Sequence, residues 1–219
     1  MKKILIPILL FATLFSEKIC AQENKTDFRQ KLIFGLRAGV NYSKVYDAKG
    51  DNFVADPKCG FAGGAFISIP IGTYLGIQPE FIFSQKGFKA TGYVLGLPYK
   101  LTRTTTFIDV PLFLCLKASE FVTVLAGPQF SYLVKQVDAF GNGTTTIEQE
   151  QNFEQQDIRK NLFGLSVGTN INLKHFVISG RSAWDVSKNN ADGSSSTPRY
   201  KNFNYQITLG YRFFTENIQ

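Results

Sequence analysis

Residue types that commonly carry catalysis and metal binding are scarce in this chain of 219 residues. It has one histidine, one methionine, one tryptophan and three cysteines. It also lacks a phosphate-binding glycine loop, a zinc-like spacing of cysteine and histidine, and a serine nucleophile elbow. The single histidine, His175, stands in a predicted tight turn between two strand-like segments. We therefore expect no enzymatic activity, no cofactor and no bound metal.

Long apolar runs are missing beyond the first 15 residues. Residues 4–15 form an apolar run after Lys2 and Lys3, and Ala21 is a small residue suited to cleavage. We therefore expect residues 1–21 to be a secretory signal peptide. No later segment approaches the roughly 20 apolar residues that a membrane helix needs. This excludes a helical membrane protein but not a β-barrel, whose signal per strand is much weaker.

Alternation of apolar and polar residues is the strongest pattern that the sequence does contain. In residues 203–213, six apolar or aromatic positions alternate without a break with Asn204, Gln206, Thr208, Gly210 and Arg212. A period of two gives a strand with one apolar and one polar face. Seven further runs predict strands at 34–43, 59–69, 74–86, 102–116, 121–134, 161–172 and 176–186.

The links between these predicted strands alternate in length. Three links are tight, at 70–73, 117–120 and 173–175, and four are long and polar, at 44–58, 87–101, 135–160 and 187–200. Short turns at one end and long loops at the other are typical of bacterial outer-membrane barrels, whose short turns face the periplasm. The sequence therefore predicts an all-β fold, an eight-stranded antiparallel up-and-down transmembrane β-barrel with short periplasmic turns and long extracellular loops.

This fold divides the chain into four parts. After the signal peptide at 1–21, residues 22–33 form an N-terminal periplasmic segment and residues 34–214 form the outer-membrane barrel. Residues 215–219 form a C-terminal tail. The expected location is the outer membrane of a Gram-negative envelope.

The polar faces of the strands would form the barrel interior. The charged residues expected there are Arg37, Glu80, Asp109, Arg181, Asp185 and Arg212. Buried charges are tolerated when they are paired, and equal numbers of cations and anions would allow pairing. Since an eight-stranded barrel is just wide enough for side chains to fill it, we predict an interior closed by this charge network and no diffusion pore. The alternative is a proton or ion path, or a catalytic carboxylate pair, among the same residues.

The long links also carry charge. Lys89, Lys100 and Arg103 make the second one basic, and we hypothesise that they meet lipopolysaccharide phosphates; a plain solvated loop is the alternative. Cys59 and Cys115 would lie at opposite ends of the barrel, so we expect them to be unpaired. The third long link contains the acidic residues Asp138, Glu148, Glu150, Glu154 and Asp157.

Four segments resemble the PorT-like outer-membrane β-barrel family. They are FGLRAGVNYS at 34–43, LGIQPEFIFSQKG at 75–87, IDVPLFL at 108–114 and GPQFSYL at 127–133. The resemblance covers about residues 34–214 and implies insertion by the barrel-assembly machinery, in contact with outer-membrane lipid and lipopolysaccharide. The assembly signal would be Tyr211, Phe213 and Phe214, although five further residues follow it.

The expected function is that of a non-enzymatic outer-membrane barrel. It would act as a structural or adhesive element, or as a subunit of an envelope or secretion assembly with envelope protein partners and no nucleic acid. Two alternatives stay open at this point. One is a lipid A-modifying barrel enzyme, and the other is a soluble periplasmic lipocalin-like barrel that binds an apolar ligand.

Overall fold

The computed structural model describes residues 27–49, 54–94, 97–141, 146–150, 160–188 and 199–214, and the expected signal peptide and C-terminal tail lie outside these ranges. Within them, no helix is both long and apolar enough to cross a membrane. The elements are the 3-10 helix η1 (Phe28–Gln30) and the strands β1 (Ile33–Lys49), β2 (Val54–Pro70), β3 (Leu75–Val94), β4 (Leu97–Lys117), β5 (Val122–Gly141), β6 (Thr146–Glu150), β7 (Asn161–Leu173), β8 (Phe176–Asp185) and β9 (Arg199–Phe214).

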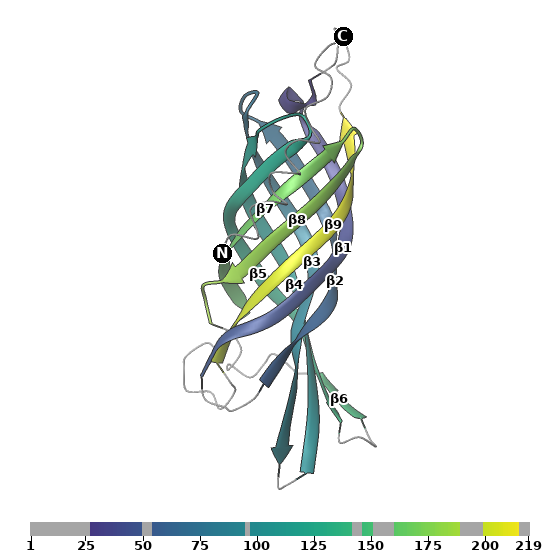
Figure 1. The fold of residues 1–219 in the computed structure, drawn as a ribbon, viewed down its shortest axis with the longest axis vertical. Coiled ribbons are helices and arrows are strands. Elements are labelled where there is room, and N and C mark those ends of the chain that lie inside the picture. The colour runs from purple at the N-terminus through teal and green to yellow at the C-terminus, as the bar shows by residue number, and fades with distance from the viewer. Residues whose placement is uncertain are drawn as a thin grey trace, which may run out of the picture.

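Eight of these strands close into an antiparallel barrel (Figure 1). Each pairs with its neighbours along the chain, and β1 pairs with β9 to complete the ring. The short strand β6 pairs only with the far end of β5, outside the ring. All eight predicted strands and the predicted closed barrel are therefore confirmed.

The two faces of the barrel wall differ in polarity, and the apolar face is outside. On β1, Leu36 is 57% exposed while its neighbour Arg37 is only 4% exposed, and on β9 Leu209 is 56% exposed while Thr208 is buried. A soluble barrel that binds an apolar ligand would need the opposite arrangement, with the apolar face around its pocket. The lipocalin-like alternative is therefore wrong.

Aromatic residues lie at both ends of the apolar outer band. On β9, Phe203 and Tyr205 stand at one end and Phe213 at the other, with Ile207 and Leu209 between them. Ten residues of strand span about 33 Å, or about 25 Å along the barrel axis at a tilt near 40°, which is the height of the apolar band of outer-membrane barrels. Aromatic residues on the neighbouring strands lie beside those of β9 at both ends of the band. Tyr42 is opposite Tyr205 at one end, and Phe34 is opposite Phe213 and Phe176 opposite Tyr211 at the other.

Much of the long links that the structure describes is strand, which corrects the prediction of those parts as loops. The link predicted at 87–101 is a hairpin in which β3 runs to Val94 and β4 starts at Leu97. In the link at 44–58, β1 continues along β9 up to Lys49, and β2 pairs with β3 from Val54 onward. The β3–β4 hairpin projects beyond the barrel (Figure 1). Backbone groups still pair there, but the apolar alternation that marks a strand in the sequence has ended.

The two described cysteines are both free thiols. Cys59 is exposed, whereas Cys115 is buried in the interior. Cys59 pairs with Tyr42 in the β1–β2 ladder, toward the long-hairpin end of the barrel. Cys115 pairs with Gly76 in the β3–β4 ladder, close to the end of the barrel that has the short turns. The two residues are therefore far apart along the barrel axis.

A charged residue on the outer band tests whether that band faces lipid. Replacing Leu209, near mid-height of β9, by arginine is expected to lower the free energy of unfolding by about 2–4 kcal/mol, because the guanidinium would lie in hydrocarbon. The matched control is Leu173→Arg at the end of β7, which is expected to cost only about 0–1 kcal/mol. Urea unfolding in lipid bilayers measures both. Equal losses at the two sites would contradict a lipid-facing band.

Candidate functional site

The barrel interior is the candidate functional site, because charged side chains gather there away from solvent. The six predicted interior charges, Arg37, Glu80, Asp109, Arg181, Asp185 and Arg212, are all buried, each at most 6% exposed. They do not form one network. The structure places them in three regions: around Glu80, around Asp109 and Asp185, and at the short-turn end, where Arg212 lies.

Glu80 on β3 is the centre of the largest cluster. Arg181 on β8 donates to both of its carboxylate oxygens, from Nη1 at 2.5 Å and from Nη2 at 2.8 Å. Gln78 donates to Oε1 at 2.6 Å, and Nη2 of Arg37 lies 3.4 Å from the same oxygen. In the closed ring, β3 and β8 are four strands apart in either direction, so the Arg181–Glu80 pair crosses the lumen between opposite walls.

Each buried cation of the central region also lies against an aromatic ring. A cation over a ring face is stabilised by the ring quadrupole, and more so where water is excluded. The rings that serve this role point inward, unlike the outer aromatic rows. The pairs are Arg37 over Phe66 at 4.3 Å, Arg181 over Phe113 at 4.8 Å, and Lys86 over Phe107 at 4.9 Å.

The other two predicted acids bind partners outside the Glu80 cluster. Asp109 on β4 forms an ion pair at 3.0 Å with Lys86, a residue that the sequence analysis placed on a strand but not in the charge network. Asp185 on β8 accepts a hydrogen bond of 2.7 Å from the side-chain amide of Asn202. The two carboxyl groups thus have separate hydrogen-bond partners.

A third buried pair was missed by the sequence analysis. Arg103 on β4 donates from Nε and Nη2 to the two carboxylate oxygens of Asp138 on β5, at 2.8 and 2.7 Å. Arg103 had been predicted on a strand beside the second long link, and Asp138 in the third long link. The prediction that Arg103 meets lipopolysaccharide is wrong because its side chain is buried and paired.

A β-bulge explains why Asp138 was hidden from the sequence pattern. Thr106 pairs with Lys135 and Phe107 with Leu133, so Val134 is an extra residue on β5. Consequently Val134 and Lys135 are both exposed, and the inward-facing positions change from odd to even numbers beyond them. A bulge re-aims the following side chains in this way. Strict alternation would have placed Asp138 on the outer face.

The predicted balance of interior charge is also wrong. Among the described residues, the buried cations are Arg37, Lys86, Arg103, Lys117, Arg181 and Arg212, and the buried anions are Glu80, Asp109, Asp138 and Asp185. Cations are therefore in excess. The excess lies at the short-turn end, where Lys117 and Arg212 line one cavity. Arg212 donates there to the carbonyl oxygen of Lys174, in the β7–β8 turn.

The short-turn end is covered by the segment before β1. Gln30 donates from its side chain to the hydroxyl of Thr73 at 2.6 Å, and Lys117 donates to the carbonyl oxygen of Arg29. Arg29 in turn pairs with Asp27 at 2.8 Å. The hydrogen bonds from Arg29 hold the pKa of the Asp27 carboxyl below its usual value. Residues 27–31 therefore close this end over the interior.

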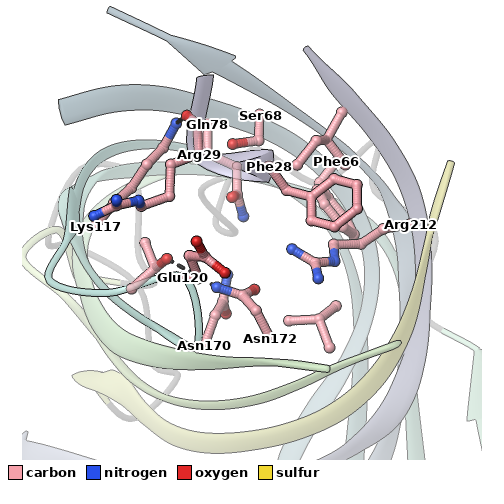
Figure 2. A pocket seen from close by; sticks show the side chains of 13 residues that line it. Phe28, Arg29, Phe66, Ser68, Gln78, Lys117, Glu120, Asn170, Asn172 and Arg212 are labelled. Atoms are coloured by element: carbon pink, nitrogen blue, oxygen red, sulfur yellow. Dashed lines mark hydrogen bonds between the residues drawn. The ribbon is translucent and has the colours of Figure 1, made fainter. Parts of the chain in front are cut away.

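Two small cavities are described in the barrel interior. One cavity of about 10 Å³ lies at mid-height beside Asp109, Arg181 and Gln206. A second, of about 30 Å³, lies under η1 at the short-turn end (Figure 2). Spaces of this size hold only about one to a few water molecules.

Nothing in the described part of the chain resembles a metal centre, since no three histidine, cysteine, aspartate or glutamate side chains come close enough together. His175 lies in the β7–β8 turn, with Nδ1 3.3 Å from the carbonyl oxygen of Arg212 and its ring stacked on Tyr211. Tyr211 and Phe213 are exposed on the outside at the end of β9, and the side chain of Phe214 lies outside the described set. Their role as an assembly signal stays a prediction.

These features are those of an integral outer-membrane barrel, and the comparison with protein families agrees. The chain belongs to the family described as outer membrane protein beta-barrel domain, whose model matches residues 20–189. The comparison with curated proteins gives no match.

Solved structures of bacterial outer-membrane barrels are similar to this chain. Ail, the attachment invasion locus protein of Yersinia pestis, is 16% identical with a TM-score of 0.50, over 84% of this chain and 99% of Ail. Neisserial surface protein A is 11% identical with a TM-score of 0.46, over 82% and 97%. OprG of Pseudomonas aeruginosa is 14% identical with a TM-score of 0.43, over 85% and 98%. At these identities the likeness concerns the fold alone.

Neutralising Glu80 tests whether its cluster holds the barrel together. Glu80→Gln keeps the side chain's size but leaves Arg181 and Arg37 buried beside a neutral amide, so we expect a loss of about 3–5 kcal/mol in the free energy of unfolding. The control is the double variant Glu80→Gln/Arg181→Gln, whose loss is expected to be smaller than the sum of the single losses. Urea unfolding in detergent or lipid measures the losses of Glu80→Gln, of Arg181→Gln and of the double variant. Additive losses would show that the two residues do not interact.

Proposed function

We propose that this protein is a non-catalytic outer-membrane barrel with a closed interior, oriented with its short turns in the periplasm and its long hairpins outside the cell. It acts there as a structural or adhesive element, or as a subunit of an envelope or secretion assembly. The resemblance of four segments to PorT-like barrels supports the assignment to that narrower family. Its surroundings, by this proposal, are outer-membrane lipid, lipopolysaccharide and the barrel-assembly machinery that inserts it.

The observation that carries the proposal is the inverted wall of the barrel, with apolar side chains outside and paired charges inside. The outer face matches hydrocarbon in height and composition, and the pair between Arg181 and Glu80 joins opposite walls across the lumen. A channel needs a continuous water-filled path, whereas this lumen is occupied by ion pairs and rings. This arrangement supports the proposal of a closed barrel over that of a channel.

The projecting hairpins support a role at the cell surface. β3 and β4 continue as a paired ladder to Val94 and Leu97, and β5 extends to Gly141 with β6 at its side (Figure 1). A paired sheet is a stiffer platform than a loop for contact with another surface. Lys89 and Lys100 are exposed on this part and can meet lipopolysaccharide phosphates.

The enzymatic alternative finds less support. A lipid A-modifying barrel needs reactive groups that its lipid substrate can reach. The polar candidates on the strands are buried and already bonded: Ser84 accepts from Asn41 at 2.8 Å, and Asp185 accepts from Asn202 at 2.7 Å. His175 lies at the opposite end of the barrel from the long hairpins. The geometry therefore favours a barrel without catalysis.

Planar-bilayer recording tests the closed interior. The wild-type protein is expected to give no steady conductance, because the Glu80 cluster blocks the lumen. Glu80→Ala/Arg181→Ala removes the bridge between opposite walls and is expected to raise the frequency of ion-conducting openings. Leu36→Ala, which shortens a lipid-facing side chain, serves as the control and is expected to behave like wild type. A large and steady wild-type conductance would refute the proposal.

Lipid A analysis separates the proposal from the enzymatic alternative. Expression of the protein in a host that lacks it is expected to leave the mass spectrum of lipid A unchanged, since the polar candidates Ser84 and Asp185 are buried and already hydrogen-bonded. The matched control is the same host with an empty vector. A new lipid A species that disappears in the Asp185→Asn variant would establish an enzyme instead.

A further inference from the structure

Aromatic and basic side chains lie together on the outer wall where β8, β9 and β1 approach the long-hairpin end. These three strands are neighbours in the ring (Figure 1). Trp184 on β8 is opposite Phe203 on β9, and Phe203 is opposite Lys44 on β1. Residues opposite each other in a sheet point to the same face, and Lys44 shares its face with Tyr42, which is exposed on the outer wall. We name Trp184, Phe203 and Lys44 the interface row.

The interface row lies at the edge of the apolar outer band. Tyr42 and Tyr205, the next outward-facing pair along β1 and β9, belong to the aromatic end of that band, and Lys44 follows Tyr42 by two residues. Two residues of strand span about 6–7 Å. Because aromatic rows mark the interface between hydrocarbon and water, the Lys44 side chain is at the level of the lipid head groups.

The ammonium of Lys44 is exposed on the outer wall. Lys44 forms no ion pair with the described residues of the chain. Among the side chains of β1, β8 and β9 that the structure describes, Asp185 is the single carboxylate, and it is buried on the inner side of the wall. An anion from the surroundings can therefore approach Lys44 without competition from these side chains.

The ring of Phe203 holds this charge in place. Nζ of Lys44 lies 5.5 Å from the centre of the ring, and the ring is packed edge-on against Tyr205 with 4.8 Å between the ring centres. A cation over a ring face is attracted by the ring quadrupole, and this contact uses none of the hydrogen-bond acceptors that an ammonium needs. Lys44 thus keeps its N–H donors for an anion, and a charge placed in advance loses less side-chain entropy on binding.

The wall on the bilayer side of Trp184 has room for an acyl chain. Gly180 and Ser182 are the outward-facing residues of β8 that precede Trp184, and a Cβ at Gly180 would meet no other atom within 4 Å. On β9, the residues opposite them are the larger Ile207 and Tyr205, which are exposed. The outer surface of β8 is therefore lower than that of β9. A membrane lipid fits this shape better than a free anion does.

We propose that this part of the outer wall binds one lipid through its phosphate group, with Lys44 on the phosphate and an acyl chain along β8. The inference rests on the proposed function, which places the long-hairpin end in the outer leaflet. The phosphate-bearing lipid there is the lipid A part of lipopolysaccharide. A hydrogen bond between two charged groups is about twice as strong as a neutral one, and the rings of Trp184 and Phe203 are suited to the boundary between head group and hydrocarbon.

Trp184 is the single tryptophan of the chain, so its fluorescence reports on this site. The protein, purified from membranes, is reconstituted in phosphatidylcholine with brominated acyl chains, which quench a tryptophan that they touch. Lipid A without bromine, or its dephosphorylated form, is then mixed in. A lipid that binds beside Trp184 displaces the brominated lipid and restores the fluorescence. We expect lipid A to do so at an about fivefold lower mole fraction than the dephosphorylated form, which is the contribution of one lysine near an anionic membrane surface.

Three variants assign this preference to Lys44. Lys44→Gln removes the charge and is expected to abolish the preference for the phosphorylated lipid, whereas Lys44→Arg keeps the charge and is expected to retain it. Lys135→Gln is the matched control, because Lys135 is exposed on β5, four strands away on the opposite wall, and it is expected to leave the preference unchanged. Equal losses in Lys44→Gln and Lys135→Gln would indicate a general attraction of lipid A to the basic surface and would overturn the site.

The wild-type measurement separates this site from the proposed function. If brominated lipid does not quench Trp184, the outer band does not face lipid, and the proposed function fails together with the site. If quenching occurs but lipid A and its dephosphorylated form restore the fluorescence equally, the barrel stays in the membrane and the site alone is overturned. This comparison needs no substitution, so it decides the proposal even if a variant fails to fold.

Discussion

The carboxylate of Glu80 and the guanidinium of Arg181 meet in the middle of the barrel, from strands that stand opposite each other in the ring. A barrel whose apolar side chains point outward has no large hydrophobic core, so its interior must be held by polar contacts. Buried charges are stable only when their partners are well placed. The bidentate geometry of this pair meets that condition, and the fit of the other interior side chains around it depends on the same closure.

The apolar residues that do lie inside are divided into small groups between the charges. Each group is a cluster of a few side chains and not a continuous core, unlike a typical soluble domain. Rings from these groups cover the buried cations, so the apolar and charged parts of the interior support each other. The clusters are Ile33, Phe66 and Val177; Phe113, Cys115 and Leu125; Phe107, Leu133 and Leu162; and Phe88, Ala90 and Tyr200.

The two ends of the barrel differ in structure. At one end the hairpins of β3–β4 and β5–β6 project beyond the wall and offer a paired surface. At the other end η1 covers the interior, and the buried side chains of Lys117 and Arg212 line a small polar cavity. The two ends therefore differ in chemistry as well as in length.

The sequence by itself determined the strands, the closed antiparallel barrel and the direction of each wall face, because a period of two is a local property that residues 203–213 display directly. Only the tertiary structure decided which interior charges meet. The pairing of Glu80 with Arg181 depends on closure, which brings residues 101 positions apart across the lumen. Asp138 points inward because a bulge shifts the register by one residue. Local periodicity predicts neither the position of such a bulge nor which interior side chains meet across the lumen.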